Sequence, residues 1–423
     1  MKYYSKLEVS KHNNKEDCWV IIDNGVYNLT DFMKSHSGGY DPLQIAGGDA
    51  TQLFYSIHPK EAKNILKSKQ FRNKYFKGKI KIDRKSGEYF NCNTKFYNNL
   101  RMHVEKELKD ANIPLRDDIS YKLYNILIIL IYFYLYYLVF HKKKTSKVAF
   151  VLFTMVTFTI AVGIGHEGYH GGIAQSKTYR KLISKFTLTS LLGHGPNTWM
   201  KSHNVLHHGY TNTSFDDNKF FGSKFIRLHE DTKLNAIHKY QHIYSFILYT
   251  IGLVPMLIFT NPIKELNLIM SSKSNLELIT YIIFKGIWFW LLFINPYKKG
   301  KLKISILYQL FLSLYLNVFF VVNHNQIENE VKKETCFAKH QINHSTNYSS
   351  GSVLVNLLTG GLNHQIEHHL FPSYSHHTYP TISKILQKYL KENKIKIKYN
   401  NYENIFIAIK EHIKFLKLMG NKN

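Results

Sequence analysis

Histidines are the residues of this chain most able to do chemistry. The sequence contains 23 of them, and they are clustered: six lie between His166 and His208, and five lie between His364 and His377. Imidazole nitrogen is a common ligand for zinc, copper, iron and nickel. This clustering predicts a metal site built from two distant parts of the chain.

Three short motifs and one further histidine supply the candidate ligands, and each lies at or just beyond an apolar segment. Their members are His166, His170, His203, His207, His208, His324, Gln365, His368 and His369. Within a motif the side chains are mostly three or four residues apart, and side chains at that spacing lie on one face of an α-helix. Eight imidazoles and one amide are too many for one ion, since structural zinc needs four ligands. The set therefore predicts a two-metal site, and histidine-rich iron suits oxygen chemistry.

Apolar segments must position these motifs. Four segments of 18 or more residues contain no Asp, Glu, Lys or Arg and are long enough to cross a bilayer; they are Leu123–Phe140, Val148–Gly165, Ile243–Ile263 and Ile304–Ile327. A fifth, Leu278–Tyr297, contains Lys285, and a charge inside a membrane is costly. The motifs must meet on one side of the membrane, so we expect about four crossings and expect Leu278–Tyr297 not to cross fully.

Charge and cysteine content argue against a nucleic-acid-binding protein and against a fold held by disulfides or zinc. The chain has 56 basic and 29 acidic residues, a formal charge of +27, but the positive charge is spread over both ends and several loops. This distribution favours an anionic membrane surface, and we expect no nucleic-acid partner. Cys18, Cys92 and Cys336 are odd in number and far apart, so neither a disulfide framework nor a zinc knuckle is indicated.

The chain divides into several parts, and its fold class is therefore multi-domain. Residues 1–85 indicate a small soluble α+β domain, with a strand pair around Asn24-Gly25 and helices near Asp49–Tyr55 and Pro59–Lys67. Residues 86–121 form an amphipathic connector. Residues 122–390 form an all-α membrane domain, and residues 391–423 form a basic helical tail.

The histidine motifs resemble the three histidine boxes of membrane fatty acid desaturases. The most specific stretches are residues 203–212 (HNVLHHGYTN) and 360–372 (GGLNHQIEHHLFP). A third box that begins with Gln365 resembles the front-end subgroup, which desaturates between an existing double bond and the carboxyl end. The resemblance covers roughly residues 120–390.

This resemblance implies a fold, a cofactor and a ligand set. The expected fold has about four transmembrane helices and a cytosolic helical cap, and the nine residues named above would bind two non-haem Fe ions. Glu167, Asn212 and Asn363 are candidates for supporting the ligands. Six further histidines lie near the boxes but outside the family pattern, so we leave them out of the site: His194, His340, His344, His364, His376 and His377.

The N-terminal domain is similar to cytochrome b5. The similarity lies in residues 36–39 (HSGG), 46–51 (AGGDAT) and 54–59 (FYSIHP). It implies haem b with His36 and His58 as axial ligands. Ser37 stands where the family usually has proline, so we expect a less rigid loop.

Together the two resemblances imply an O2-dependent fatty acid desaturase of the endoplasmic reticulum membrane. It would be multi-pass, with the haem domain and the histidine boxes on the cytosolic face. The substrate would be a fatty acyl-CoA or an acyl-phospholipid, and the electrons would come from a separate NADH-cytochrome b5 reductase. A tethered haem domain raises the effective concentration of the electron carrier.

Four alternatives are open at this point. Two are enzymes, a sphingolipid long-chain-base desaturase and a membrane lipid hydroxylase. The other two are a membrane-anchored electron-transfer protein and a lipid-sensing relative without catalysis.

Overall fold

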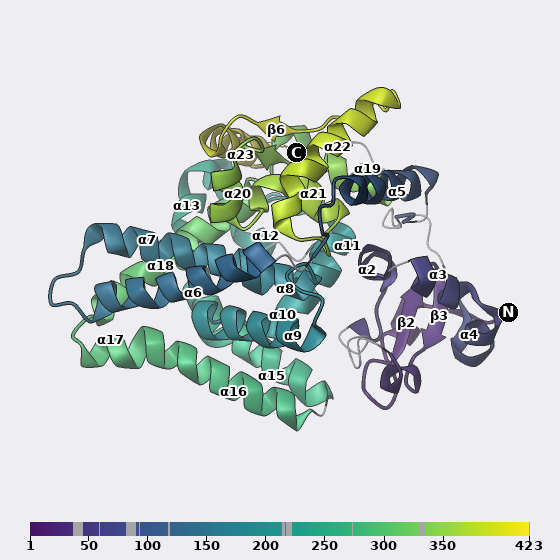
Figure 1. Cartoon of the computed structure of the whole chain (residues 1–423), viewed down its shortest axis with the longest axis horizontal. Helices are drawn as coiled ribbons and strands as arrows, with labels where there is room; N and C mark the ends of the chain where they lie inside the picture. The colour runs from purple at the N-terminus through teal and green to yellow at the C-terminus, as the bar shows by residue number, and fades with distance from the viewer. Residues whose placement is uncertain are drawn as a thin grey trace.

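The computed structural model describes residues 1–36, 45–58, 60–81, 90–92, 94–116, 119–213, 216, 222–272, 274–329 and 335–422. A small domain that contains the β-sheet holds the N-terminal residues, and the rest of the chain is almost entirely helical (Figure 1). The predicted order, an α+β domain followed by an all-α membrane domain, is confirmed.

A four-stranded sheet forms the N-terminal domain, in the order β1-β4-β3-β2. Strands β1 and β4 pair in parallel, and the other neighbouring strands pair antiparallel. The β2–β3 hairpin turns at Asp23 and Asn24, whose φ angles of 48° and 64° suit the tight turn of a hairpin. The elements are β1 (Tyr3–Tyr4), α1 (Lys6–Val9), β2 (Trp19–Ile22), β3 (Gly25–Asn28), α2 (Thr51–Ile57), α3 (Lys60–Lys67), α4 (Lys69–Tyr75) and β4 (Phe76–Ile80).

In the part of the chain that the structure describes, five helical segments are long and apolar enough to cross a membrane, as expected of a multi-pass protein. Several are continuous through a π-helical turn, which widens the helix without ending it. The segments are Ile119–Phe140, Lys147–His170, Ala236–Ser272, Asn275–Lys298 and Leu302–Val321. The first is helix α6 and the last is helix α18. The other three contain α7 (Lys147–Ile160) and α8 (Glu167–His170); α13 (Gln241–Ile251), α14 (Leu253–Pro255) and α15 (Asn261–Ser272); and α16 (Asn275–Phe289) and α17 (Asn295–Lys298).

The end of α17 lies beside the turn between α6 and α7, which is the end of the bundle away from the histidines (Figure 1). Lys301 donates hydrogen bonds to the Lys143 carbonyl at 3.0 Å and to Thr145 at 2.8 Å. Segment Asn275–Lys298 therefore reaches the far end of the bundle. By length and composition Asn275–Lys298 is a candidate span, so whether Leu278–Tyr297 crosses the membrane fully stays a prediction.

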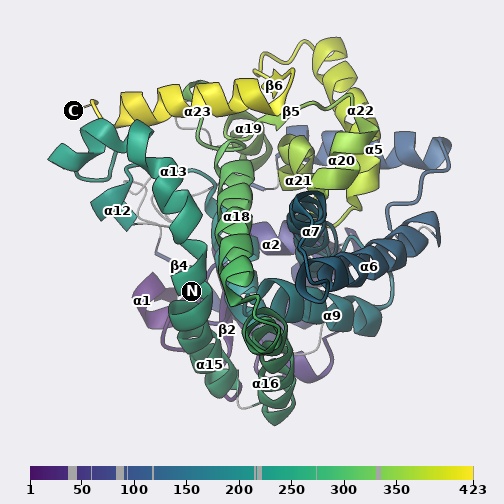
Figure 2. The ribbon, with the colours of Figure 1, turned by 90° about the vertical axis from the view of Figure 1, so that its left-hand side faces the viewer.

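The segment Ala236–Ser272 instead begins and ends on the histidine side. Near its start, Gln241 donates to the Leu416 carbonyl at 2.8 Å in the C-terminal helix. Near its end, Glu265 contacts Asn197, just before the second histidine box. In Figure 2, α7 is seen nearly end-on, whereas the chain from α13 to α15 descends along one side.

Lys285 is accommodated inside the bundle by partners that include two carbonyls remote in the chain. Its ammonium group donates to the carbonyls of Gly193 at 2.6 Å and Leu257 at 2.9 Å. It also lies 3.8 Å from the centre of the Trp288 ring, a cation–π contact. These contacts replace water around the charge, so the helix can carry it inside the bundle.

Most of the remaining helices form a cap over the histidine side of the bundle, whereas α9 packs against the bundle core through Ile183. In the connector, α5 buries Tyr97, Leu100, Val104 and Leu108 on one face. Strand β5 (Asn347–Tyr348) pairs in parallel with β6 (Asn401–Tyr402). The helices are α5 (Lys95–Asp110), α9 (Lys177–Lys185), α10 (Pro196–Trp199), α11 (His208–Tyr210), α12 (Gly222–Phe225), α19 (Phe337–Asn343), α20 (Val353–Thr359), α21 (Gln365–Leu370), α22 (Tyr379–Glu392) and α23 (Ile405–Met419).

Candidate metal centre and haem site

All eight predicted histidines converge in two adjoining buried groups. Within each group the candidate ligand nitrogens lie within 4.8 Å of one another. The groups meet where the rings of His208 and His369 stack, with their centres 4.2 Å apart. The first group is His166, His170, His203, His208 and His368; the second is His207, His324 and His369.

Gln365 lies at the edge of the three-histidine group. Its side-chain nitrogen is 2.9 Å from Nε2 of His324, and its oxygen accepts from Asn323 at 3.2 Å. The amide therefore stands where it could complete the coordination of an ion held by His207, His324 and His369. The structure thus brings the whole predicted set of nine residues together.

The second box divides between the groups in a way that α-helical spacing does not predict. Residues Met200–His207 form a π-helix, in which residue i bonds to residue i+5. His203 therefore joins His208, five residues away, and His207 turns to the other group. The rings of His203 and His207 lie near each other, with centres 5.1 Å apart, but they belong to different groups, whereas His166 and His170 share one.

The third box divides as well. Gln365 and His369 face the three-histidine group, whereas His368 joins the five-histidine group. The two boxes together link both groups. A pair of metal ions held here would share two supporting helices.

The donor atoms fit resident metal ions. Nε2 of His166 lies 2.8 Å from Nε2 of His203 and 3.1 Å from Nε2 of His368, so electron-rich nitrogens face one another. Among the described residues, Nε2 of His170 and Nε2 of His369 are buried with no hydrogen-bond partner. A cation between these nitrogens supplies the attraction that this packing lacks.

Burial keeps the rings neutral, which metal coordination requires. It lowers the pKa of His203, His208, His368 and His369 well below the usual histidine value, with neighbouring histidines adding to the effect. The pKa of His324 falls to about 3, chiefly because of the same desolvation.

Several of the rings are oriented by hydrogen bonds on the nitrogen that faces away from the groups. His324 donates from Nδ1 to the His344 carbonyl at 2.9 Å. Nδ1 of His368 lies 3.2 Å from the Tyr379 hydroxyl, and Nδ1 of His369 lies 3.3 Å from the Thr211 hydroxyl. Such partners fix the tautomer and direction of a ligand.

Asp216 is the supporting residue that sequence reasoning missed. Its carboxylate accepts from Nδ1 of His207 and from the backbone of Asn212. It follows His207 by nine residues in an irregular stretch, so no spacing could have indicated it. Of the supporting residues proposed from sequence, Asn212 donates to the His324 carbonyl at 2.7 Å, and Glu167 pairs with His376.

The histidines that were left out lie outside both groups. His340 and His344 stack on each other with ring centres 3.9 Å apart. His364 pairs with Asn356 at 3.1 Å. The third supporting residue proposed from sequence, Asn363, bonds to Thr359 at 3.1 Å and touches neither group.

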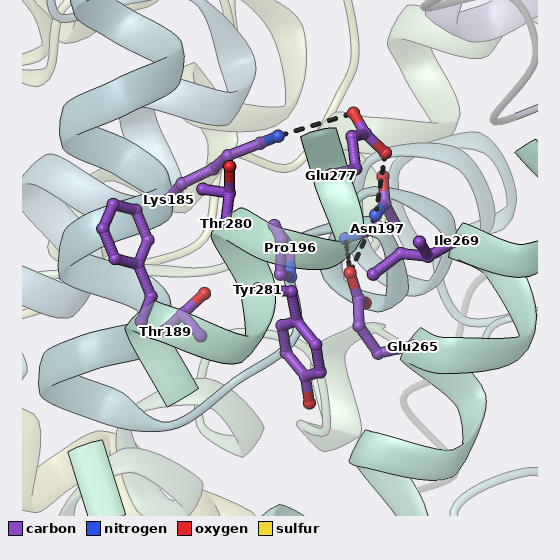
Figure 3. A pocket seen from close by; sticks show the side chains of 10 residues that line it. Lys185, Thr189, Pro196, Asn197, Glu265, Ile269, Glu277, Thr280 and Tyr281 are labelled. Atoms are coloured by element: carbon purple, nitrogen blue, oxygen red, sulfur yellow. Dashed lines mark hydrogen bonds and ion pairs between the residues drawn. The ribbon is translucent and has the colours of Figure 1, made fainter. Parts of the chain in front are cut away.

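A buried carboxylate positions the helix of the second box (Figure 3). Glu265 accepts from the backbone N–H groups of Asn197 at 3.0 Å and Thr198 at 2.7 Å, and from both of their side chains at 2.8 Å. These N–H groups belong to the first turn of α10, and the first N–H groups of a helix have no partner within that helix. Glu265 therefore caps the helix that leads to His203 and His207.

The predicted haem ligands face each other in the N-terminal domain. The ring centres of His36 and His58 are 6.0 Å apart and tilted by 40°. His58 donates from Nδ1 to the Phe54 carbonyl at 3.1 Å, which leaves Nε2 as the nitrogen able to bind iron. Burial and the nearby His36 lower the pKa of His58 to about 4, so the ring stays neutral. Ser37, Gly38 and Gly39 lie outside the described residues.

Comparison with known proteins agrees with this geometry. The family model described as fatty acid desaturase matches residues 146–400. This chain belongs to the fatty acid desaturase family. A model described as cytochrome b5-like heme/steroid binding domain matches residues 5–81, so the resemblance to cytochrome b5-fused desaturases is confirmed.

The desaturase is similar to curated proteins over nearly its full length. It is 29% identical to acyl-lipid (8-3)-desaturase B of Dictyostelium discoideum, with 100% of this chain and 95% of the relative covered. It is 29% identical to an acyl-lipid (8-3)-desaturase of Physcomitrium patens, with 99% and 92% covered. It is also 27% identical to delta(5) fatty acid desaturase A of Dictyostelium discoideum, with 99% and 94% covered. The cytochrome b5 of Ostreococcus tauri virus 2, a solved structure, is 38% identical over 18% of this chain and 95% of its own, with a TM-score of 0.17.

The family and the two histidine sites define the cofactors. The cytochrome b5-like domain makes this a haem protein, and the paired histidine groups of a desaturase make it a protein of two non-haem irons.

Proposed function

We propose that this desaturase is an oxygen-dependent front-end enzyme. It inserts a cis double bond into an unsaturated fatty acyl chain, between an existing double bond and the carboxyl end. The observation that carries the proposal is the pair of adjoining histidine groups, whose eight rings are each at most 5% exposed. When bound, two iron ions supply the oxygen activation needed to remove hydrogen from an unactivated methylene.

The ligand set follows from the two groups. His166, His170, His203, His208 and His368 would hold one ion. His207, His324, His369 and Gln365 would hold the other. The partners on the far nitrogens keep the rings directed inward, and burial keeps water away from the reacting carbon.

The N-terminal domain serves as the electron carrier in this proposal. His36 and His58 would hold haem b, with the Phe54 carbonyl fixing the tautomer of His58. A separate NADH-cytochrome b5 reductase is the proposed source of electrons. In a cell, the protein would lie in the endoplasmic reticulum membrane with both cofactor sites on the cytosolic side.

The relatives support a finer assignment. Those that match the whole chain are named acyl-lipid (8-3)- and delta(5) desaturases. We therefore propose an acyl lipid, rather than a free acyl-CoA, as the substrate and the fifth carbon as the position of the new double bond.

Expression in a host that makes no polyunsaturated fatty acids tests the function. Cells are fed a panel of unsaturated acids, and double-bond positions in each lipid class are read by mass spectrometry. A new bond at carbon five of a phospholipid acyl chain is expected, and it should vanish in the variants His207→Ala and His368→Ala. The surface variant His229→Ala is the control and should keep the activity.

Other products would replace the proposal. An unsaturated long-chain base would make the protein a sphingolipid desaturase. A hydroxylated lipid without a new double bond would make it a hydroxylase. Full iron and haem content with no lipid product would favour an electron-transfer or sensing role.

A further inference from the structure

At helix α2, side chains of the haem domain pack into the core of the cap, and a side chain from the second box packs against the core of the haem domain. Tyr55, on α2, is 2% exposed and belongs to the buried core of the cap, together with Tyr97 and Leu370. Val205, from the helix of the second box, packs in the opposite direction against the core of the haem domain. Phe54 packs against both cores. The two hydrophobic cores are therefore interlocked, and the connector is not their only link.

This contact lies between the two cofactor sites. Phe54 stacks on the ring of His58, with the ring centres 4.5 Å apart and 28° between the planes. On the other side, Val205 stands between the iron-ligand candidates His203 and His207 in the same helix. Figure 1 shows α2 beside α11, which directly continues that helix, and α2 contacts both.

Arg101, outside both α2 and the helix of the second box, holds α2 through a hydrogen bond. It lies on the connector α5 and donates a hydrogen bond to the Tyr55 carbonyl in the last turn of α2. A cation at the C-terminal end of a helix is favoured by the helix dipole. The guanidinium is 5.7 Å from the centre of the Tyr97 ring, and its side chain is 13% exposed. The Tyr55 hydroxyl donates to Asp23, which ties the same residue back to the haem domain.

We propose that α2 is a permanent docking element that holds the haem site against the helix of the second box, with Phe54 as the bridging side chain. The proposal rests on the proposed function, since it concerns how electrons reach the iron site. Each transfer oxidises the haem by one electron and reduces the iron site by one. The contact is largely apolar, with Tyr55 buried and Phe54 and Val205 partly buried, so it differs from transient docking that depends on opposite charges.

Full-length enzyme with haem and iron bound provides the test. Val205→Glu places a charge in the interlocked layer, and Arg101→Gln removes the link to the Tyr55 carbonyl. Leu7→Glu, on the exposed helix α1, introduces the same charge into the same domain outside the contact. Two quantities are measured: amide hydrogen exchange of α2, and the rate at which prereduced haem is reoxidised after mixing with substrate and oxygen.

Val205→Glu and Arg101→Gln should each speed exchange in α2 and slow haem reoxidation, by roughly tenfold or more for the charge in the buried contact. Haem absorbance and iron content should stay normal, and product formed with a soluble chemical reductant should match the wild type. Leu7→Glu should change neither quantity. The wild-type reoxidation rate should be the same in low and high salt, because apolar contacts are not screened.

Two results would overturn the docking proposal. One is normal exchange and reoxidation in both Val205→Glu and Arg101→Gln; the other is a wild-type rate that falls steeply with salt. Failure of the proposed function looks different, because wild-type enzyme would then make no unsaturated product with either electron source.

Discussion

Asp216 accepts a hydrogen bond from Nδ1 of His207, with its carboxylate oxygens 3.1 and 3.2 Å from that nitrogen. Both side chains are buried. His207 belongs to the same group as His324 and His369. A carboxylate behind a ligand histidine fixes its direction and strengthens it as a donor.

Asp216→Asn should weaken metal binding by the three-histidine group. The expected loss of iron affinity is roughly 10- to 100-fold, the usual effect of removing such a partner. Iron per chain is measured after challenge with a chelator. Asp231→Asn is the matched control, because Asp231 pairs with His229 at 3.4 Å on the surface. Equal iron retention in both variants would contradict the role given to Asp216.

Glu265→Ala should destabilise the helix of the second box. Glu265 is fully buried, and its loss leaves the N–H groups of Asn197 and Thr198 without their acceptor. We expect a loss of about 3 kcal/mol, and a smaller loss for Glu265→Gln, which keeps an acceptor. The melting temperature in detergent measures both. Glu277→Gln should have a smaller effect, since the ion pair of Glu277 with Lys185 is partly exposed and its hydrogen bond from Asn197 is long, at 3.5 Å; a similar loss there would argue against a specific cap.

His58→Ala should abolish haem binding. The remaining ring, His36, cannot hold the iron from both sides. The ratio of Soret absorbance to protein absorbance should fall to that of the haem-free protein. His12→Ala is the control, because His12 stacks on Trp19 in the same domain. Full Soret intensity in His58→Ala would refute the axial assignment.

Single cysteines should report which segment crosses the membrane. Ser271→Cys, at the end of α15, should react with a membrane-impermeant thiol reagent from the same side as a cysteine at Ser10. Lys299→Cys should react only from the opposite side. The native cysteines are buried and supply little background. Labelling of Lys299→Cys from the side of Ser10 would show that Asn275–Lys298 does not cross.

His412 should make the fold sensitive to acid. It donates to the Asn325 carbonyl at 2.8 Å, and burial lowers its pKa from 6.5 to about 4. Between these values the unfolded chain binds a proton that the folded chain does not, so stability is full above pH 6.5 and falls as the pH drops. The loss by pH 4 is on the order of 3 kcal/mol.

The free energy of unfolding in mixed micelles, measured from pH 7 to pH 4, checks this prediction. His412→Gln should be less stable at pH 7 and should show a shallower decline in acid. The surface variant His229→Gln should follow the wild type. An unchanged slope in His412→Gln would place the acid sensitivity elsewhere.

Local patterns predicted the local elements well. The β2–β3 hairpin, the helices α2 and α3 and the amphipathic α5 were all indicated by short stretches of sequence. The hydrogen bonds of Lys285 could not be read from a local pattern, because Gly193 and Leu257 come from elsewhere in the chain.

The sequence alone determined the kinds of atoms at both cofactor sites. Imidazole nitrogen is a ligand suited to iron, so His36, His58 and the histidine boxes carry their chemistry in their identity and spacing. Tertiary structure decided how the ligands are shared and supported. A π-helical turn sends His203 and His207 to different groups, and Asp216 reaches His207 from an irregular segment. It also decided that α2 rests on the helix of the second box, because packing between distant segments leaves no periodic trace in the sequence.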